Sequence, residues 1–111
     1  MRYGAALLLL LMAALLEAGG DAVIRIGLHT SLTARRAGYL AAGGLVLLGY
    51  GCLVNAPPWA FGRLLGVYVV LFFLIAQAIG WVVFGQVPTR SIWLGGLFIA
   101  IGGAIITVSS P

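Results

Sequence analysis

The two acidic side chains of this sequence, Glu17 and Asp21, lie in one otherwise apolar stretch, where a carboxylate could exchange a proton for a cation. With Arg25 and His29 they recur at every fourth position, so on a helix each shares a face with the next. A helix that enters a bilayer at Tyr3 reaches Glu17 after about 21 Å of the roughly 30 Å hydrocarbon core. Glu17 is therefore the deeply placed acid of the pair.

The expected chemistry at Glu17 is exchange of a proton for a cation. A carboxyl group in an apolar site favours its neutral form, and a bound organic cation favours the carboxylate, so cation binding releases the proton. In a dimer, two such carboxyl groups would face one chamber, repel each other and couple their titrations. The alternative is that Glu17 serves only as an internal hydrogen-bonding partner. Because acids inside a membrane are costly and mark functional sites, we favour exchange.

Asp21 has a cation one helical turn away, and we expect its carboxylate to form a structural ion pair with Arg25 near the membrane interface. The alternative is a second proton site at Asp21, or a gate that includes Arg25. Arg63, one turn into the third apolar segment, can extend its guanidinium to the interface. Either arginine could also contact a lipid headgroup.

The composition indicates an all-α membrane protein. Of the 111 residues, 63% are hydrophobic and 7% are charged. Backbone polar groups must pair within each spanning segment, so helices are expected. The loops between segments are short, which predicts a single domain, 1–111, folded as an antiparallel up-and-down bundle of four transmembrane helices. The predicted spans are about 3–28, 37–54, 59–84 and 91–108.

Other classes of function find no support in the residues. The sequence holds no catalytic nucleophile with a partner base, no cluster of metal ligands and no phosphate-binding loop, so we expect neither an enzyme nor a bound metal or cofactor. All six cations are arginines, and none forms a basic run with interleaved aromatics, so a nucleic-acid partner is not expected.

Paired glycines in the last apolar segment predict a helix contact. Gly95 and Gly96 lie seven positions before Gly102 and Gly103, so the pairs share one face of a helix. Small residues let helix backbones approach closely in lipid. We favour a homodimer interface on this face, because the other three helices already supply a bundle interior. Oligomerisation itself is expected because one bundle of this size can hardly enclose a chamber alone. The alternative is packing against another helix of the same chain.

Several short motifs occur together along the chain. In the first segment, a Gly follows the deep Glu by three residues and a cation follows it by eight, as Glu17, Gly20 and Arg25. The third segment ends in WVVFGQ (81–86), which fits the pattern W-x-x-F-G-Q. The last segment reads GGLFIAIGGAII (95–106), with its glycines spaced by two helical turns.

These motifs, with the four-span layout and the length, resemble the small multidrug resistance family of the drug/metabolite transporter superfamily. The YnfA-type branch is also similar, since its third helix begins Gly-Arg with a Tyr six positions after the Gly, here Gly62, Arg63 and Tyr68. The resemblance implies proton-coupled export of small cations, quaternary ammonium or guanidinium-like, by a homodimer in the bacterial cytoplasmic (inner) membrane. Tyr68 would then offer its ring to the cation, with plain packing as the alternative.

Two other functions fit part of the pattern. A lipid or lipid-linked sugar flippase component would use arginines to contact an anionic headgroup. A non-transporting assembly subunit would need no deep acid. The third segment has no glycine between Gly66 and Gly80, where members of the family commonly bend, and this favours the two alternatives.

Overall fold

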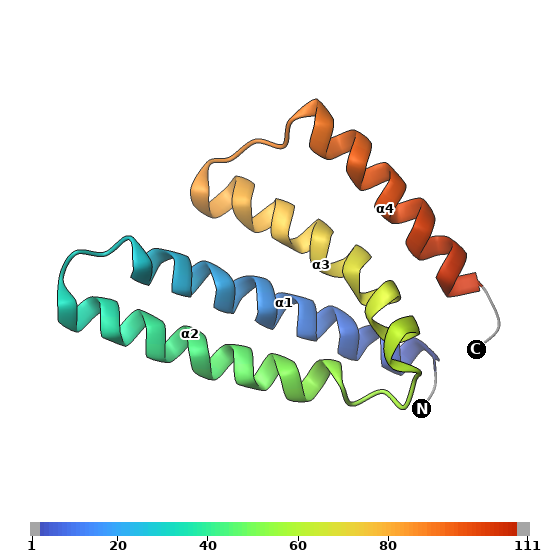
Figure 1. Cartoon of the computed structure of the whole chain (residues 1–111), viewed down its shortest axis with the longest axis horizontal. Coiled ribbons are helices and arrows are strands. Elements are labelled where there is room, and N and C mark those ends of the chain that lie inside the picture. The colour runs from blue at the N-terminus through green and yellow to red at the C-terminus, as the bar shows by residue number, and fades with distance from the viewer. Residues whose placement is uncertain (1–2, 109–111) are drawn as a thin grey trace.

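The computed structural model describes residues 3–108, and these form four helices joined by short loops (Figure 1). The four helices are long and apolar enough to cross a membrane. This confirms the prediction of an all-α membrane protein with four transmembrane helices. In chain order they are α1 (Tyr3–Leu28), α2 (Thr33–Val54), α3 (Phe61–Phe84) and α4 (Arg90–Val108).

The helix ends follow local backbone chemistry. The second helix begins four residues before the predicted span, since Thr33 to Arg36 already form its first turn. The third begins two residues later than predicted, after an extended Ala60. It ends at Phe84 and is capped by Gly85, whose φ of 66° is the left-handed conformation that glycine adopts freely. At the start of α4, the Thr89 hydroxyl oxygen accepts a hydrogen bond from the Ile92 backbone N–H, at 3.3 Å.

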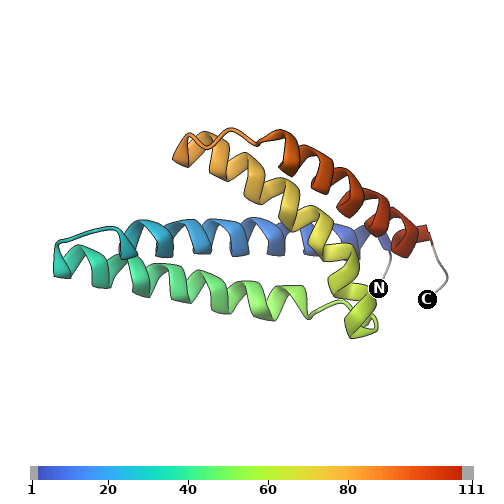
Figure 2. The same cartoon turned by 45° about the horizontal axis from the view of Figure 1, so that its top comes forward.

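The helices form a thin, open arrangement rather than a closed ring. The first helix packs against α2 and α3, and α4 packs against α3. Figures 1 and 2 show α4 on the far side of α3 from the α1–α2 pair. The chain measures 51 × 34 × 18 Å along its principal axes. The start of α1 and the end of α4 meet, where the Tyr3 hydroxyl donates to the Thr107 carbonyl at 3.5 Å.

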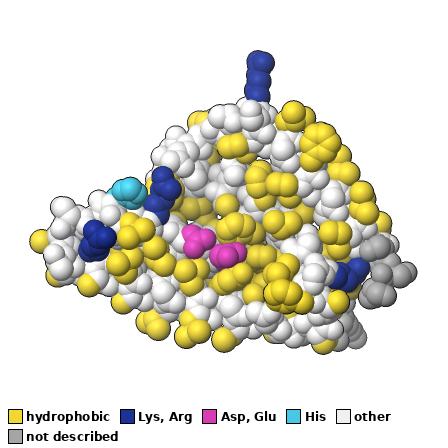
Figure 3. All heavy atoms as spheres, in the orientation of Figure 1, with side chains coloured by type: hydrophobic (Ala, Val, Ile, Leu, Met, Phe, Trp, Pro, Cys, Tyr) yellow, Lys and Arg dark blue, Asp and Glu magenta, His cyan; other side chains and the backbone are white. Residues whose placement is uncertain are grey.

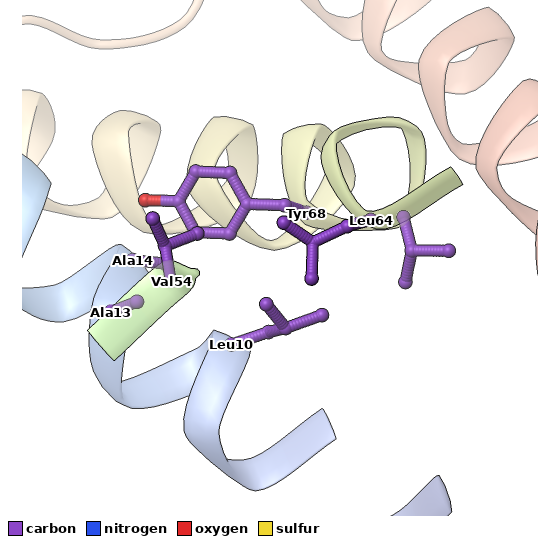
Figure 4. Close-up of a cluster of buried hydrophobic side chains, with 7 residues drawn as sticks. Leu10, Ala13, Ala14, Val54, Leu64 and Tyr68 are labelled. Carbon is purple, nitrogen blue, oxygen red and sulfur yellow. The ribbon is translucent and has the colours of Figure 1, made fainter. Parts of the chain in front are cut away.

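A small core lies where α1, α2 and α3 meet (Figure 4). It is built mainly from aliphatic side chains, with one tyrosine ring among them. Its buried members are Leu10, Ala13, Ala14, Val54, Leu64, Val67 and Tyr68. The core thus fixes the position of a hydroxyl-bearing side chain inside the membrane span.

Glycines bring α1 and α2 into close contact. A Cβ atom on Gly43 would lie 2.5 Å from Ile24 Cγ1 and 3.0 Å from the Gly20 carbonyl oxygen. On the other helix, a Cβ atom on Gly20 would lie 2.9 Å from Leu47 Cδ2. No side chain fits at either position without displacing a neighbour, so these glycines set the separation of the two helices.

In each glycine pair of α4, one glycine packs against α3 and the other faces open space. A Cβ atom on Gly96 would lie 2.7 Å from the Phe73 ring, and one on Gly103 would collide with the Val70 side chain, both on α3. Packing within the chain, the alternative weighed above, therefore accounts for these two. Gly95 and Gly102 have open space where a Cβ atom would lie. An interface between two chains at this helix stays a prediction, and these two glycines are the ones left open for it.

Candidate functional site

The deep carboxylate of α1 is bonded to the tyrosine of the core. The Tyr68 hydroxyl donates a hydrogen bond to Glu17 Oε1 at 2.7 Å. The Tyr68 side chain is only 4% exposed, whereas Glu17 is half-buried. A buried, packed ring holds its hydroxyl in one place, so the donor is fixed relative to the carboxylate. The structure thus brings together two of the residues singled out from the sequence.

Two further aromatic rings flank this pair. The centroid of the Tyr50 ring of α2 lies 5.9 Å from that of the Tyr68 ring, and the centroid of the Phe72 ring lies 6.1 Å from it. Aromatic faces next to a carboxylate can attract an organic cation. Sequence reasoning missed Tyr50. The available signal was a hydroxyl-bearing ring inside an otherwise apolar helix, but nothing in the sequence set its depth against Glu17.

A cleft of about 250 Å³ opens between α1 and α3 beyond the hydrogen-bonded pair. Asp21 and Arg25 line it from α1, and Phe72 and Phe84 line it from α3. In Figure 3 the two acidic side chains lie next to each other in the middle of the face shown, with apolar side chains around them. The cleft is therefore a mixed surface of carboxylate, guanidinium and aromatic rings, within a span that is otherwise apolar.

The ion pair expected between Asp21 and Arg25 is not formed. Both residues lie within the described chain and line the same cleft, but no salt bridge joins them. The Arg25 guanidinium lies instead over the Phe84 ring, 5.3 Å from its centroid. The prediction considered only the i, i+4 spacing along α1, whereas the end of α3 brings an aromatic face within reach of the arginine. Asp21 is left exposed in the cleft.

Arg63 lies at the opposite end of α3 and serves the packing of the chain. Its guanidinium donates to the Ile106 carbonyl of α4 at 2.9 Å and lies 5.6 Å from the centroid of the Trp59 ring. A cation near the last carbonyls of a helix is favourable. Arg63 is thus placed apart from Arg25 and the cleft, and its contact with a lipid headgroup stays a prediction.

Comparison with known proteins identifies the family. The family described as "Uncharacterised BCR, YnfA/UPF0060 family" matches residues 5–111. The chain belongs to the YnfA/UPF0060 family. This family is similar to the small multidrug resistance proteins and belongs to the drug/metabolite transporter superfamily, as the motifs indicated. No solved structure matches the chain.

Relatives in the YnfA/UPF0060 family cover almost the whole chain. The UPF0060 membrane protein YfjF of Bacillus subtilis is 35% identical over 101 residues, 90% of each chain. A UPF0060 membrane protein of Bacillus licheniformis is 32% identical over 105 residues, 93% of each chain. One from Clostridium perfringens is 31% identical over 103 residues, 91% of this chain and 89% of its own. With its four apolar helices, this is a multi-pass bacterial membrane protein.

Proposed function

We propose that this protein exports small organic cations, quaternary ammonium or guanidinium-like, in exchange for protons at Glu17. The observation that carries the proposal is the hydrogen bond from the buried Tyr68 hydroxyl to Glu17 Oε1 inside a membrane span. A carboxyl group is costly in hydrocarbon and therefore marks a functional site, and a cleft lined by Ala18 and Asp21 begins next to Glu17 along α1. This chemistry is transport rather than enzymatic catalysis, and it needs no cofactor.

The exchange follows from the two forms of one carboxyl group. In the proposed cycle, Glu17 binds a proton while no cation is present, so the empty site carries no net charge in its apolar surroundings. A cation that enters stabilises the carboxylate, and the rings of Tyr50, Tyr68 and Phe72 offer it aromatic faces. Donation from the Tyr68 hydroxyl also favours the carboxylate. Since proton and cation bind the same group in turn, inward movement of one drives outward movement of the other.

A homodimer completes the proposal. One chain is only 18 Å thick along its shortest axis, and its cleft is open on one side. A second copy would cover the cleft and bring a second Glu17 to the same chamber, where the two carboxyl groups would titrate as a pair. The outward glycines of α4, Gly95 and Gly102, offer a place for close contact between the copies.

The proposal is tested by proton release when tetrapropylammonium is added to the detergent-purified protein in weak buffer. Wild type should release protons, and Glu17→Gln should release none. Glu17→Asp, which keeps an acid at the position, should still release protons at a changed cation concentration. Equal release from wild type and Glu17→Gln would move the exchange to Asp21. Release from neither folded protein would contradict proton exchange and favour a lipid-handling or assembly role.

A further inference from the structure

The cleft between α1 and α3 is lined from Ala18 to Arg25 on α1, beyond Glu17 along the helix, and it contains an acceptor with no partner in the described chain. Asp21 is exposed there, and its carboxylate has no hydrogen bond or ion pair with any residue of the described chain. The neighbouring lining at Ala18, Ala22 and Ala76 is small, which leaves room in front of the carboxylate. The volume of about 250 Å³ is enough for a small organic cation.

The same cleft already holds one planar cation, which belongs to the protein itself. The Arg25 guanidinium lies 5.3 Å from the centroid of the Phe84 ring. An arginine one turn beyond an aspartate on a helix ordinarily pairs with it. Here the arginine contacts the ring and leaves the carboxylate of Asp21 open. The Phe84 face therefore accepts a guanidinium group in the same cleft as a carboxylate that lacks a partner in the described chain.

We propose that Asp21 and Phe84 form an outer subsite that selects planar cations with N–H groups, of the guanidinium type. The Asp21 carboxylate would accept the N–H groups of the compound, and the Phe84 ring would take its flat face. Arg25 is the internal competitor, which leaves the ring when the compound binds. This subsite rests on the proposed function, because a compound held there still needs Glu17 for exchange.

Phe72 connects the outer subsite to the exchange site. Its ring lines the cleft and also stacks on the Tyr68 ring, which donates to Glu17. Asp21 follows Glu17 by four residues, a rise of about 6 Å along α1. A cation held at Asp21 would therefore lie about one helical turn from Glu17, with the Phe72 ring between the cleft and the hydrogen-bonded Tyr68. A quaternary ammonium ion has no N–H group to donate, so the outer subsite binds it much more weakly than it binds a guanidinium.

The first test compares two probe cations, phenylguanidinium and tetrapropylammonium, by isothermal titration calorimetry on the purified full-length protein. Asp21→Asn should weaken phenylguanidinium binding about tenfold or more, the worth of a charge-assisted hydrogen-bonded pair. It should weaken tetrapropylammonium binding by less than about threefold, since that ion keeps only a Coulombic attraction in a half-open site. Phe84→Leu should weaken phenylguanidinium about two- to fivefold.

The second test removes the internal competitor. Arg25→Gln should tighten phenylguanidinium binding about two- to fivefold, since the ring no longer has to release a guanidinium. The matched control is Arg35→Gln, which removes the same charge from the exposed first turn of α2, outside the cleft. That variant should leave the affinity unchanged. An electrostatic effect alone would tighten both probes equally in Arg25→Gln.

Two results would overturn the outer subsite. One is that Asp21→Asn weakens the binding of both probes equally, or of neither. The other is that Arg25→Gln tightens the binding of both probes equally, or of neither. Asp21 and Arg25 are exposed, so their variants should keep the wild-type melting temperature in detergent. Either result can occur while Glu17→Gln still abolishes proton release, so failure of the subsite is distinguishable from failure of proton exchange.

Discussion

Replacement of Tyr68 by phenylalanine isolates the role of one hydroxyl group. That hydroxyl donates to Glu17 Oε1 at 2.7 Å, and the ring beneath it is packed in the core and 4% exposed. Phenylalanine keeps the ring, so packing changes little. A hydrogen bond to a charged group contributes about 1.5–3 kcal/mol. The hydroxyl also has some partner when Glu17 is protonated, so we take a value just below this range, about 1.4 kcal/mol. That is a factor of about ten in an equilibrium constant.

The direction of the effect depends on pH. The hydroxyl favours the ionised carboxylate, so Tyr68→Phe makes the proton a stronger competitor of the cation. At a pH where the empty wild-type site is protonated, tetrapropylammonium should bind about tenfold more weakly to the variant. As the pH rises and both proteins lose the proton before the cation binds, the two affinities should converge. Calorimetric titrations across a pH series measure both limits.

Two outcomes would refute this reasoning for Tyr68. Equal affinities at all pH values would mean that the hydrogen bond to Glu17 does not affect exchange. A loss of the same size at every pH would mean that the hydroxyl contacts the cation directly. It would then have no effect on the competition between proton and cation at the carboxylate. Thermal unfolding in detergent provides the control for folding, since the variant retains the ring that packs in the core.

Three further predictions concern packing. Gly43→Val should lower the free energy of unfolding in detergent by about 1–3 kcal/mol, because the valine side chain would collide with Ile24 across the α1–α2 contact. The control Gly44→Ala, at an open position, should change the stability little. Gly103→Leu should lower the melting temperature because it forces α4 off α3, and an unchanged value would contradict the α3–α4 contact. In a Cys52→Ser background, a cysteine at Gly95 should form a crosslink between chains, and one at Gly103 should form none.

Much of the fold was predictable from the sequence because the membrane restricts the choices. Unbroken apolar runs of about 20 residues have to be helices, and proline, glycine and arginine mark where they stop. The first span, 3–28, was predicted with the observed bounds. The start of α2 was placed four residues late because Arg35 and Arg36 read as a polar loop, although arginine is a good helix former.

The site was predictable along one helix but not between helices. The depth of Glu17 follows from counting residues, and Tyr68 was suggested by the resemblance to the family. The stacking of Arg25 on Phe84 depends on where α3 ends relative to α1, which periodicity does not encode. The place of Tyr50 next to Tyr68 depends in the same way on where α1 holds α2 and α3 relative to each other.

The helix contacts divide the chain into two hairpins that are made one after the other by the ribosome. Helices α1 and α2 contact each other as neighbours in the chain, and so do α3 and α4, so each hairpin can insert into the membrane as it leaves the ribosome. The hydrogen bond from Tyr68 to Glu17 joins one hairpin to the other. The nascent chain therefore lacks the Tyr68 donor to Glu17 until the second hairpin docks. Docking of the two hairpins is therefore the step that completes the pair of side chains on which the proposed exchange depends.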